Sequence, residues 1–528
     1  MRPLGVELAA MLAARGVDTI FGIPGVHNVE LYRGIEEAGI RHVLTRHEQG
    51  AGFMADGYAR ASGKPGVCFV ISGPGLTNIM TPMGQAYSDS VPMIVISSCL
   101  DETAARKGQL HQMRDQEGAA RTVCDWSETA TTAEAAYELI NRAFQEFHSE
   151  RKRPKHIQIP IKVLSAPAPP ADLSKMALSD AFFGDAPDLF QVIPHLLRQS
   201  SRPILILGGG AVEAVQPIRS VLDRCALPVF TTYAGRGIVP TDYPFLFGSM
   251  LARPDSASVL KSADLIIAVG TELSEVDLWR DHLGHDCRMV HVDIDNASLR
   301  NVDGVSMRFS CGSHRFFTML DASGDLPSSF EWTKEDVAKA RRRWRSELQA
   351  ERPGILPVCD ALSARLPDDT MIFSDMTQFA YAAKEVWDMP RPAHWHHPFG
   401  FGTLGYALPA AIGGALGHAG PVLAIAGDYG LQYTIQELGT ASELGLSLPI
   451  LVWDNNALGE IKDCMVRAQI APNAVTLKNP HWEALAAAYD CAYAAPTSVS
   501  GLCDVVTGAF SANRPTLIKA TPDISSSS

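Results

Sequence analysis

Short, continuous runs of apolar residues recur along the whole chain, and few of them alternate with polar positions. The clearest runs are Val67–Gly75, Pro203–Val212, Ala263–Gly270 and Pro449–Asp454. Runs of this length are typical of strands that are buried on both faces of a parallel sheet. Because stretches with helical spacing separate them, we expect an α/β protein built from three doubly wound parallel-sheet domains.

Two breaks in this pattern divide the chain of 528 residues, which is longer than one core usually holds. The first is a proline- and alanine-rich stretch after Val163, and the second is the charged helical stretch Lys334–Arg352. We therefore predict an N-terminal domain, a linker, a central Rossmann-like domain, a helical linker and a C-terminal domain at residues 1–164, 165–185, 186–330, 331–352 and 353–528.

Composition and charge exclude several classes of function. The chain carries 58 acidic and 45 basic residues and no lysine- or arginine-rich run, so nucleic acid is not an expected partner. The N-terminus lacks the apolar core of a signal peptide, and no apolar run reaches the roughly 20 residues of a membrane span. Ten scattered cysteines without a C-x-x-C pair predict reduced, buried thiols in a cytoplasmic protein and give no support for zinc.

A carboxylate and an amide follow two successive strands late in the chain. Asp428 follows the expected strand Pro421–Ala426, and Asn455 follows the expected strand Pro449–Asp454. The helix Thr434–Gly445 is expected between them, so the two side chains should meet at one edge of a parallel sheet. Hard oxygen ligands suit Mg²⁺, which would take its other ligands from water and from phosphate groups.

Glycines flank this carboxylate on both sides. Gly427 and Gly430 would let the backbone approach phosphates closely, and the start of the next helix would favour their negative charge. A simpler interpretation is that Asp428 caps the following helix and that Asn455 occupies a turn. The other motifs of the chain decide against this interpretation.

The stretch "GDYG", followed by a helix, a strand and "DNNALG", resembles the thiamine-diphosphate motif, which usually begins Gly-Asp-Gly and ends in two asparagines. Tyr429 stands where the family has a small residue. The end can be aligned as Asn455–Asn456 or as Asp454–Asn455, and the second alignment keeps "ALG" in register without a gap. The resemblance implies three metal ligands: Asp428, Asn455 and the backbone carbonyl of Ala457.

Other motifs match the same family, which includes acetolactate synthase, pyruvate decarboxylase and benzoylformate decarboxylase. "RHEQGAG" contains Glu48, which in this family bonds the cofactor's ring nitrogen and helps a carbanion to form. "FGIPGVHN", "ISGPGLTN" and "FGTLGYALPAAIG" also match, and Leu404 corresponds to the apolar residue that bends the cofactor. The resemblance implies catalysis by Glu48 and cofactor contacts at Pro24, Gly25, Glu48, Thr377, Gln378, Gly402, Leu404, Gly427, Asp428, Tyr429, Gly430, Asn455, Ala457 and Leu458.

The central block carries a glycine triplet, Gly208–Gly210, directly after an expected strand. Such a triplet can mark a dinucleotide site, but the spacing G-x-G-x-x-G is absent, which favours a structural turn. In acetolactate synthases the corresponding domain helps to bind FAD. The resemblance therefore leaves FAD open as a further cofactor.

The resemblance implies decarboxylation of a small-molecule 2-oxo acid through an enamine intermediate, which is protonated to an aldehyde or added to a second carbonyl. Asp115 stands where acetolactate synthases carry a phenylalanine, and Trp126 stands near their lysine, which speaks against carboligation. Three classes stay open: a decarboxylase, an acetolactate-synthase-type carboligase, and a non-catalytic or nucleotide-binding relative. Intact Glu48, Asp428 and Asn455 count against the last class.

Several motifs look most like the branch of 2-ketoarginine (5-guanidino-2-oxopentanoate) decarboxylases, and the candidate substrate residues are His27, Asp115 and Glu460. Two carboxylates at a small cavity would favour a cation between them, such as the guanidinium of this substrate. The alternative is that Glu460 pairs with Lys462 or Arg467 at the surface, where such pairs stabilise little.

Glu48 and the metal ligands lie in different blocks of the chain. In the family that the chain resembles they meet across a subunit interface, so one chain would hold only half of each site. We therefore expect a homodimer or homotetramer with active sites between subunits.

Overall fold

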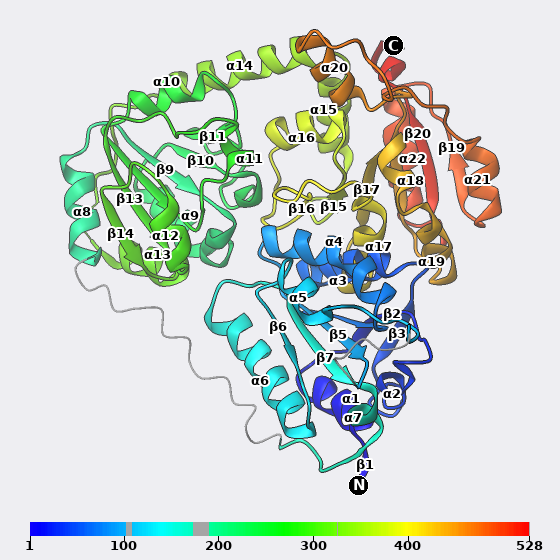
Figure 1. The fold of residues 1–528 in the computed structure, drawn as a ribbon. Helices are drawn as coiled ribbons and strands as arrows, with labels where there is room; N and C mark the ends of the chain where they lie inside the picture. Colours follow the sequence, from blue (N-terminus) through cyan, green and yellow to red (C-terminus); the bar gives the residue numbers. More distant parts are fainter. Residues whose placement is uncertain (102–107, 173–188, 325, 527–528) are drawn as a thin grey trace.

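Three six-stranded parallel sheets form the frame of the chain in a computed structural model, which describes residues 1–101, 108–172, 189–324 and 326–526 (Figure 1). Helices pack against each sheet, and the predicted α/β class with three such domains is confirmed. The N-terminal domain, drawn from blue to cyan, lies below the central and C-terminal domains in Figure 1. Much of the predicted linker 165–185 falls outside the described residues, and the predicted domain boundaries stay predictions.

The N-terminal sheet has the strand order β3-β2-β4-β5-β7-β6. Its strands are β2 (Thr19–Gly22), β3 (Arg41–Leu44), β4 (Gly66–Val70), β5 (Met93–Cys99), β6 (Trp126–Thr129) and β7 (Lys155–Pro160). Its helices are α1 (Leu4–Ala14), α2 (Val29–Tyr32), α3 (Glu48–Ser62), α4 (Pro74–Ser88), α5 (Gln116–Arg121), α6 (Ala133–Ser149) and α7 (Ile161–Ser165). A short antiparallel pair, β1 (Arg2–Pro3) with β8 (Pro167–Ala168), joins the two ends of the domain.

The central sheet has the strand order β11-β10-β9-β12-β13-β14. Its strands are β9 (Pro203–Leu207), β10 (Val229–Thr231), β11 (Leu246–Gly248), β12 (Leu265–Val269), β13 (Arg288–Asp293) and β14 (Met307–Ser310). Its helices are α8 (Leu189–Gln199), η2 (Gly209–Ala214), α9 (Val215–Arg224), η3 (Tyr233–Gly235), α10 (Ser256–Lys261), α11 (Glu275–Leu278), α12 (Asn296–Asn301) and α13 (Ser313–Ala322).

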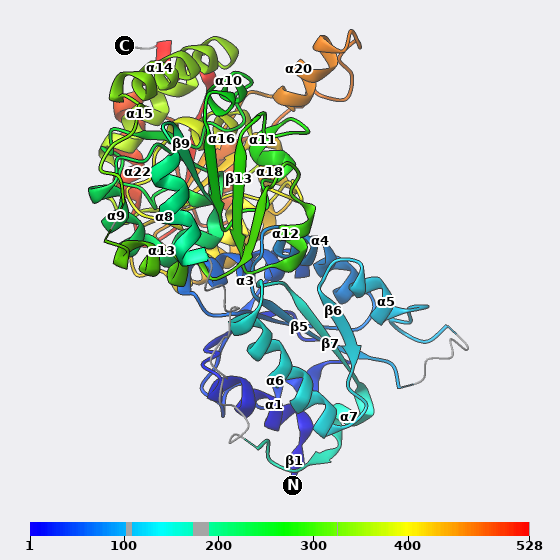
Figure 2. The same ribbon diagram turned by 90° about the vertical axis from the view of Figure 1, so that its left-hand side faces the viewer.

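The C-terminal sheet has the strand order β16-β15-β17-β18-β20-β19. Its strands are β15 (Met371–Ser374), β16 (Trp395–His396), β17 (Val422–Gly427), β18 (Pro449–Trp453), β19 (Ala492–Ala494) and β20 (Thr516–Ala520). Its helices are α15 (Ile355–Arg365), α16 (Gln378–Val386), α17 (Ala407–Gly417), α18 (Asp428–Gln432), η4 (Ile435–Glu437), α19 (Leu438–Glu443), α20 (Gly459–Arg467), α21 (Trp482–Ala488), α22 (Val499–Ala509) and η5 (Pro522–Ser526). Helix α20 projects from the body of the molecule in Figure 2.

Each sheet has its topological switch point beside the domain's first long strand. Strand β2 pairs with β3 on one side and β4 on the other, β9 with β10 and β12, and β15 with β16 and β17. The connections leave such a strand in opposite directions, which opens a crevice at the carboxyl ends where ligands bind in doubly wound folds. The chain therefore has three equivalent positions for a ligand site.

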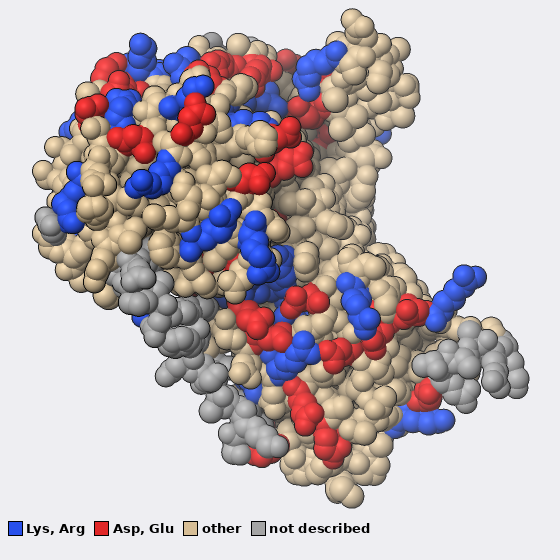
Figure 3. Space-filling model, turned by 60° about the vertical axis from the view of Figure 1, so that its left-hand side comes forward, with Lys and Arg blue, Asp and Glu red and all other residues tan. Residues whose placement is uncertain are grey.

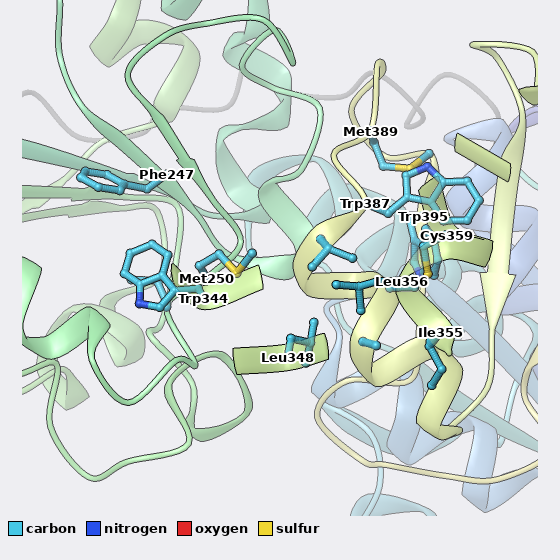
Figure 4. Close-up of a cluster of buried hydrophobic side chains, with 14 of the residues drawn as sticks. Phe247, Met250, Trp344, Leu348, Ile355, Leu356, Cys359, Trp387, Met389 and Trp395 are labelled. Carbon is cyan, nitrogen blue, oxygen red and sulfur yellow. The ribbon is translucent and has the colours of Figure 1, made fainter. Parts of the chain in front are cut away.

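A single long helix, α14 (Lys334–Glu351), joins the central and C-terminal domains. A capping box between Thr333 and Asp336 starts it. Trp344 and Leu348 are fully buried in a core that includes side chains of both domains (Figure 4). The helix is therefore packed between the two domains and is no flexible linker.

The N-terminal and C-terminal domains meet where α3 packs against α17 (Figure 1). Small residues on both helices allow this close approach. A Cβ atom at Gly57 would collide with the carbonyl oxygen of Ala410, and one at Gly413 would collide with that of Met54. The buried Tyr406 hydroxyl also donates to Asp56 Oδ1 at 2.6 Å, so the contact is specific as well as close.

Two local expectations were wrong. The helix expected over Thr434–Gly445 begins as the 3-10 turn η4, and its α-helical part, α19, covers only Leu438–Glu443. Thr434 itself lies outside the helix, and its hydroxyl bonds the carbonyl of Gly405 at 2.8 Å. The ten cysteines are free thiols, as expected, but Cys464 on α20 is exposed and not buried.

The charged side chains on the face in Figure 3 are interspersed, with lysine and arginine beside aspartate and glutamate. That face therefore offers no extended surface of one sign for a polyanion. Among the described residues, none of the helices combines the length and the apolar character needed to cross a membrane.

Gly57→Ala should lower the free energy of unfolding by about 1–3 kcal/mol, because the added methyl group would push α3 away from α17. Gly508 in α22 is the control, since nothing lies within 4 Å of a Cβ built there. Gly508→Ala should be neutral or stabilising by up to about 1 kcal/mol. Urea unfolding measures both, and equal losses for the two variants would contradict the packing argument.

Candidate functional site

The predicted oxygen ligands lie together at the carboxyl edge of the C-terminal sheet. Asp428 begins α18 directly after β17, and Asn455 follows the neighbouring strand β18. Asp428 Oδ2 accepts from the backbone N–H of Asn456 at 2.7 Å, which joins the two strand ends. Asn455 Oδ1 accepts only from the N–H of Ala457, at 3.1 Å, among the bonds of the described residues. The carboxylate, amide and carbonyl oxygens suit a hard divalent cation.

Asn479 is a member of this site that the sequence did not indicate. Its side-chain N–H groups reach Asp428 Oδ2 at 2.8 Å and Asp454 Oδ1 at 2.7 Å. Burial raises the pKa of Asp428, the Asn479 amide lowers it, and Asp454 raises it. Asp454 bonds Trp482 and pairs with the cation of Lys519, whereas Asp428 accepts from the uncharged N–H groups of Tyr429, Asn456 and Asn479.

The first strand of this sheet supplies the next group of residues. Thr377 and Gln378 follow β15 at the start of α16, beside the switch point. A Cβ at Gly427 would lie 3.3 Å from Thr377 Oγ1, so the backbone of the β17 turn passes close to that hydroxyl. Gln378 Oε1 accepts from Asn455 Nδ2 at 3.2 Å. The predicted diphosphate and metal residues are thus brought together.

Asp375 organises these turns and was missed in the sequence. Its Oδ1 accepts from the N–H of Met376 at 2.8 Å, and its Oδ2 accepts from the N–H of Gly405 at 2.9 Å. A Cβ at Gly430 would lie 2.8 Å from the same Oδ2. Burial raises the pKa of Asp375 to about 6. The only sequence signal was a lone aspartate directly after a strand.

The remaining predicted residues of this half surround the same edge. Gly402 has φ +66°, which favours glycine, and Leu404 is partly exposed and not part of the core. Tyr429 packs edge-on against Tyr433 with ring centroids 5.5 Å apart. Leu458 donates its N–H to Val475 at 2.9 Å, so the chain after Asn455 is fixed by backbone pairing.

The N-terminal domain presents the other predicted residues at its own switch point. Glu48 begins α3 after β3, is almost buried, and its Oε2 accepts from Asn78 Nδ2 at 2.9 Å. Its Oε1 lies 3.3 Å from a Cβ built at Gly75. The turn with Pro24 and Gly25 follows β2, and Asn28 Oδ1 accepts from the N–H of Gly25 at 2.7 Å.

Glu437 is a second buried carboxylate that the sequence did not indicate. It accepts from the N–H groups of Arg46 at 3.0 Å and His47 at 3.1 Å, directly before Glu48. Its backbone belongs to the C-terminal domain, so it ties the Glu48 loop to α17 and α19. Burial raises its pKa to about 7.

The candidate substrate residues have separate partners. Asp115 is exposed and caps α5, where its Oδ1 accepts from the N–H of Gly118 at 2.7 Å. Glu460 on α20 accepts from Arg352 Nη2 at 3.2 and 3.3 Å and lies 3.7 Å from Arg467. The expected pair with Arg467 thus exists, but the nearer cation is Arg352. His27 lies at the carboxyl edge of the N-terminal domain's sheet, beside Ser72.

At the switch point of the central sheet, the turns after β9 and β12 are joined by backbone hydrogen bonds. Gly208 donates to the carbonyl of Val269 at 2.9 Å and Gly210 to that of Gly270 at 3.0 Å. A Cβ at Gly208 would collide with the Gly270 oxygen. The glycines thus serve contact between the β9 and β12 turns, and the N–H groups of Gly208 and Gly210 are already used. Two of the three N–H groups of the glycine triplet are therefore not available to a phosphate of FAD.

Within the part of the chain that the structure describes, no group of three or more His, Cys, Asp or Glu side chains is placed to hold a metal. A metal held at Asp428 would therefore depend on this carboxylate with an amide and a carbonyl, a donor set that suits Mg²⁺ or Ca²⁺ better than zinc. Two switch-point edges that carry a carboxylate, glycines and oxygen ligands define an α/β enzyme that uses a phosphorylated cofactor.

Comparison with known proteins agrees with this class. The N-terminal, central and C-terminal domains of thiamine pyrophosphate enzymes match residues 4–119, 191–320 and 375–520. A protein from Pseudomonas aeruginosa named "probable 2-ketoarginine decarboxylase" is 42% identical over 528 residues, covering 98% of this chain and 93% of that protein. The acetolactate synthase isozyme 1 large subunit of Escherichia coli is 30% identical over 470 residues, covering 85% of this chain and 81% of that subunit. The chain therefore belongs to the thiamine pyrophosphate enzymes.

Asp375→Asn tests how much the burial of the charged Asp375 carboxylate, at the carboxyl edge of the C-terminal sheet, destabilises the folded protein. The pKa of Asp375 is raised from 3.8 to about 6 on folding, so the folded protein binds more protons than the unfolded chain between these values. The wild-type free energy of unfolding should then fall by about 3 kcal/mol relative to the variant as pH rises from about 4 to about 7.

Urea unfolding of the cofactor-free protein at several pH values measures this difference. Asp368→Asn, at an exposed position of the same domain, is the control and should show no such change. A wild-type protein that gains stability over the variant as pH rises would refute the desolvation argument.

Proposed function

We propose that this enzyme is a thiamine-diphosphate- and Mg²⁺-dependent decarboxylase of a 2-oxo acid with a guanidino end, 5-guanidino-2-oxopentanoate. The candidate acceptor for the guanidino end is Glu460, whose carboxylate bonds the guanidinium of Arg352 beside the ring of Tyr381. The substrate's guanidinium would have to take the place of Arg352 on this carboxylate. A carboxylate in this position offers the planar acceptor that a guanidinium recognises. The name and 42% identity of the relative from Pseudomonas aeruginosa support the same substrate.

The residues of the C-terminal edge would hold the cofactor and its metal. Asp428, Asn455 and the carbonyl of Ala457 would coordinate Mg²⁺, while the turn at Gly427, which passes close to the Thr377 hydroxyl, would face the diphosphate. When bound, thiamine diphosphate supplies the carbon nucleophile and the electron sink for loss of CO₂. The chain itself binds, orients and excludes water.

Glu48 would hold a proton at the cofactor's ring nitrogen from the N-terminal edge. Its carboxylate is almost buried and is fixed by the Asn78 amide, so it is oriented before any ligand arrives. Leu404, which is partly exposed at the opposite edge, is the apolar surface against which the cofactor would bend.

A carboligase of the acetolactate synthase type is the second candidate, favoured by the 30% identity to the isozyme 1 subunit. Asp115 speaks against it, because an exposed helix cap stands where those enzymes carry a phenylalanine near the second substrate. A non-catalytic relative would have no reason to keep Glu48, Asp428 and Asn455 together with their supporting bonds.

We further propose that the active chain is a homodimer or homotetramer with sites between subunits. Apolar side chains are exposed at both edges: Val26 (69%) and Leu110 (61%) on the N-terminal domain, and Phe401 (48%) and Tyr433 (46%) on the C-terminal domain. Exposed apolar residues around polar site residues are typical of an interface. In this assembly, the C-terminal sheet edge of one chain would cover the N-terminal sheet edge of the other.

Mixing two inactive variants tests the shared site. Glu48→Gln removes the proton-holding group, and Asp428→Ala removes the metal-binding carboxylate, so each alone should be inactive. In each mixed dimer, one of the two sites would carry neither substitution. Because random pairing on co-expression makes about half of the dimers mixed, the activity of the whole preparation should return to about a quarter of the wild-type level. A mixture that stays inactive would show that Glu48 and Asp428 of one chain form one site.

Glu460→Gln tests the substrate. For wild-type enzyme, kcat/KM for 5-guanidino-2-oxopentanoate should exceed that for pyruvate and 2-oxohexanoate, and the variant should lose about 10- to 100-fold of this preference, the worth of one charge-assisted hydrogen bond. Glu483→Gln, at an exposed site on α21, should leave the preference unchanged. An unchanged ratio in Glu460→Gln would remove this carboxylate from substrate recognition.

A further inference from the structure

A buried cluster of charges joins the N-terminal domain to the loop that carries Gly402 and Leu404. Arg60, in the last turn of α3, donates from Nε to Asp56 Oδ1 at 2.7 Å and from Nη2 to Asp89 Oδ2 at 2.9 Å. The side chains of Asp56 and Asp89 are 0% and 5% exposed. These three residues form an Asp–Arg–Asp triad in which one guanidinium bridges two carboxylates.

Asp89 holds the first end of this loop, which runs from β16 to α17. Its Oδ1 accepts from the N–H of Gly400 at 3.0 Å, and its Oδ2 accepts from the N–H of Phe399 at 3.3 Å. A Cβ built at Gly400 would lie 2.8 Å from the Cβ of Ser88. The end of α4 is thus in direct contact with the loop just before Gly402.

Asp56 holds the other end of the loop. The buried hydroxyl of Tyr406 donates to Asp56 Oδ1 at 2.6 Å, and the Arg60 guanidinium lies 5.9 Å from the centre of the Tyr406 ring. Gly402 and Leu404 lie between the two anchors. A single guanidinium therefore connects both ends of the segment that carries them.

The charges of the triad need a reason beyond stability. Burial raises the pKa of Asp89 to about 6, while Arg60 and the N–H of Gly400 lower it. Buried ion clusters add little to the stability of a fold, because desolvation offsets the attraction between the charges. They do hold hydrogen-bond donors in one orientation, because bonds to a charged acceptor are short and strong. Fixing the loop accounts for the triad better than holding the domains together.

We propose that the Asp–Arg–Asp triad is a positioning device for the cofactor, which fixes the loop so that Leu404 stays where thiamine diphosphate would bend. The inference rests on the proposed function, in which Leu404 is the surface for that bend. Arg60 and Asp89 are positioning residues, since they act through the loop. The N-terminal domain thus shapes the cofactor site of its own chain, in addition to the part that its Glu48 would play in the site shared with the second copy.

Asp89→Asn releases the loop and leaves the rest of the triad in place. The amide oxygen would stay with the charged guanidinium of Arg60, so the NH₂ group would face the N–H of Gly400. In the cofactor-free protein, hydrogen exchange of the Gly400 N–H should become faster by about 10-fold or more, the worth of one bond to a charged acceptor. Mass spectrometry of the peptide that contains Gly400 measures this rate.

The same variant should bind thiamine diphosphate with Mg²⁺ but activate it poorly. Calorimetry should give a Kd within about 10-fold of wild type, because the residues proposed to hold the metal and the diphosphate are unchanged. Exchange of the proton on the cofactor's reactive carbon, followed by NMR in deuterated buffer without substrate, should slow by about 10- to 100-fold, since a misplacement of about 1 Å costs this much. Asp504→Asn, which removes an exposed ion pair with Arg365, is the control and should change none of these measurements.

A second pair of variants keeps the test decisive if Asp89→Asn does not fold. Gly400→Ala would place a methyl group 2.8 Å from Ser88 Cβ and push the loop away from α4 without a change of charge. The cofactor's proton exchange should slow by about 10-fold or more. Adding Ser88→Gly leaves Asp89 Oδ1, at 3.5 Å, as the nearest atom and should restore the exchange to within about threefold of wild type. A general loss of stability would not be restored in this way, since glycine at a helix end stabilises nothing.

The outcomes distinguish this inference from the proposed function. Faster exchange of the Gly400 N–H with an unchanged proton exchange on the cofactor would overturn the inference, because the loop would then move without effect. Unchanged exchange of the Gly400 N–H in Asp89→Asn, loss of cofactor binding in that variant, or a double variant as slow as Gly400→Ala would overturn it as well. Wild-type protein that exchanges the cofactor's proton no faster than free cofactor does would instead overturn the proposed function.

Discussion

The buried carboxylate of Asp375 is the constraint on which the C-terminal site depends. It accepts backbone N–H groups from the β15 turn and from Gly405, and it touches the turn at Gly430. Three separate segments that must surround one cofactor are thereby held at fixed distances. Burial of this charge is costly, as the raised pKa of Asp375 indicates, and the backbone donors offset part of that cost.

The three domains share one sheet topology but carry different residues at their switch points. At the N-terminal switch point β2 and β4 carry His27 and Ser72, and at the C-terminal one β15 and β17 carry Thr377 and Asp428. At the central one the glycine turns pack backbone to backbone, and the N–H groups of Gly208 and Gly210 are bonded within the domain. The position of a site therefore follows from strand order, while its chemistry follows from a few residues after each strand.

The fold and the proximity of Asp428 to the turn at Asn455 were predictable, because continuous apolar runs and short motifs carry their information locally. Asp428 and Asn455 follow successive strands, so the right-handed crossover alone brings them together. Asn479, Glu437 and Asp89 were not predictable, since their partners lie far away in the sequence and nothing near each residue marks the contact. The position of Thr434 outside the helix likewise involves a tertiary bond, from its hydroxyl to the carbonyl of Gly405.

Helix α14 has a mechanical consequence for the proposed substrate site at Glu460. Its 18 residues span about 27 Å, and Trp344 and Leu348 hold it rigidly between the two domains. Arg352, directly after its last turn, bonds Glu460. A tilt of about 5° at the far end would move this guanidinium by about 2 Å, enough to break the bond. Substitutions in the central domain that tilt this helix would therefore weaken the ion pair at Glu460, the carboxylate proposed to bind the substrate.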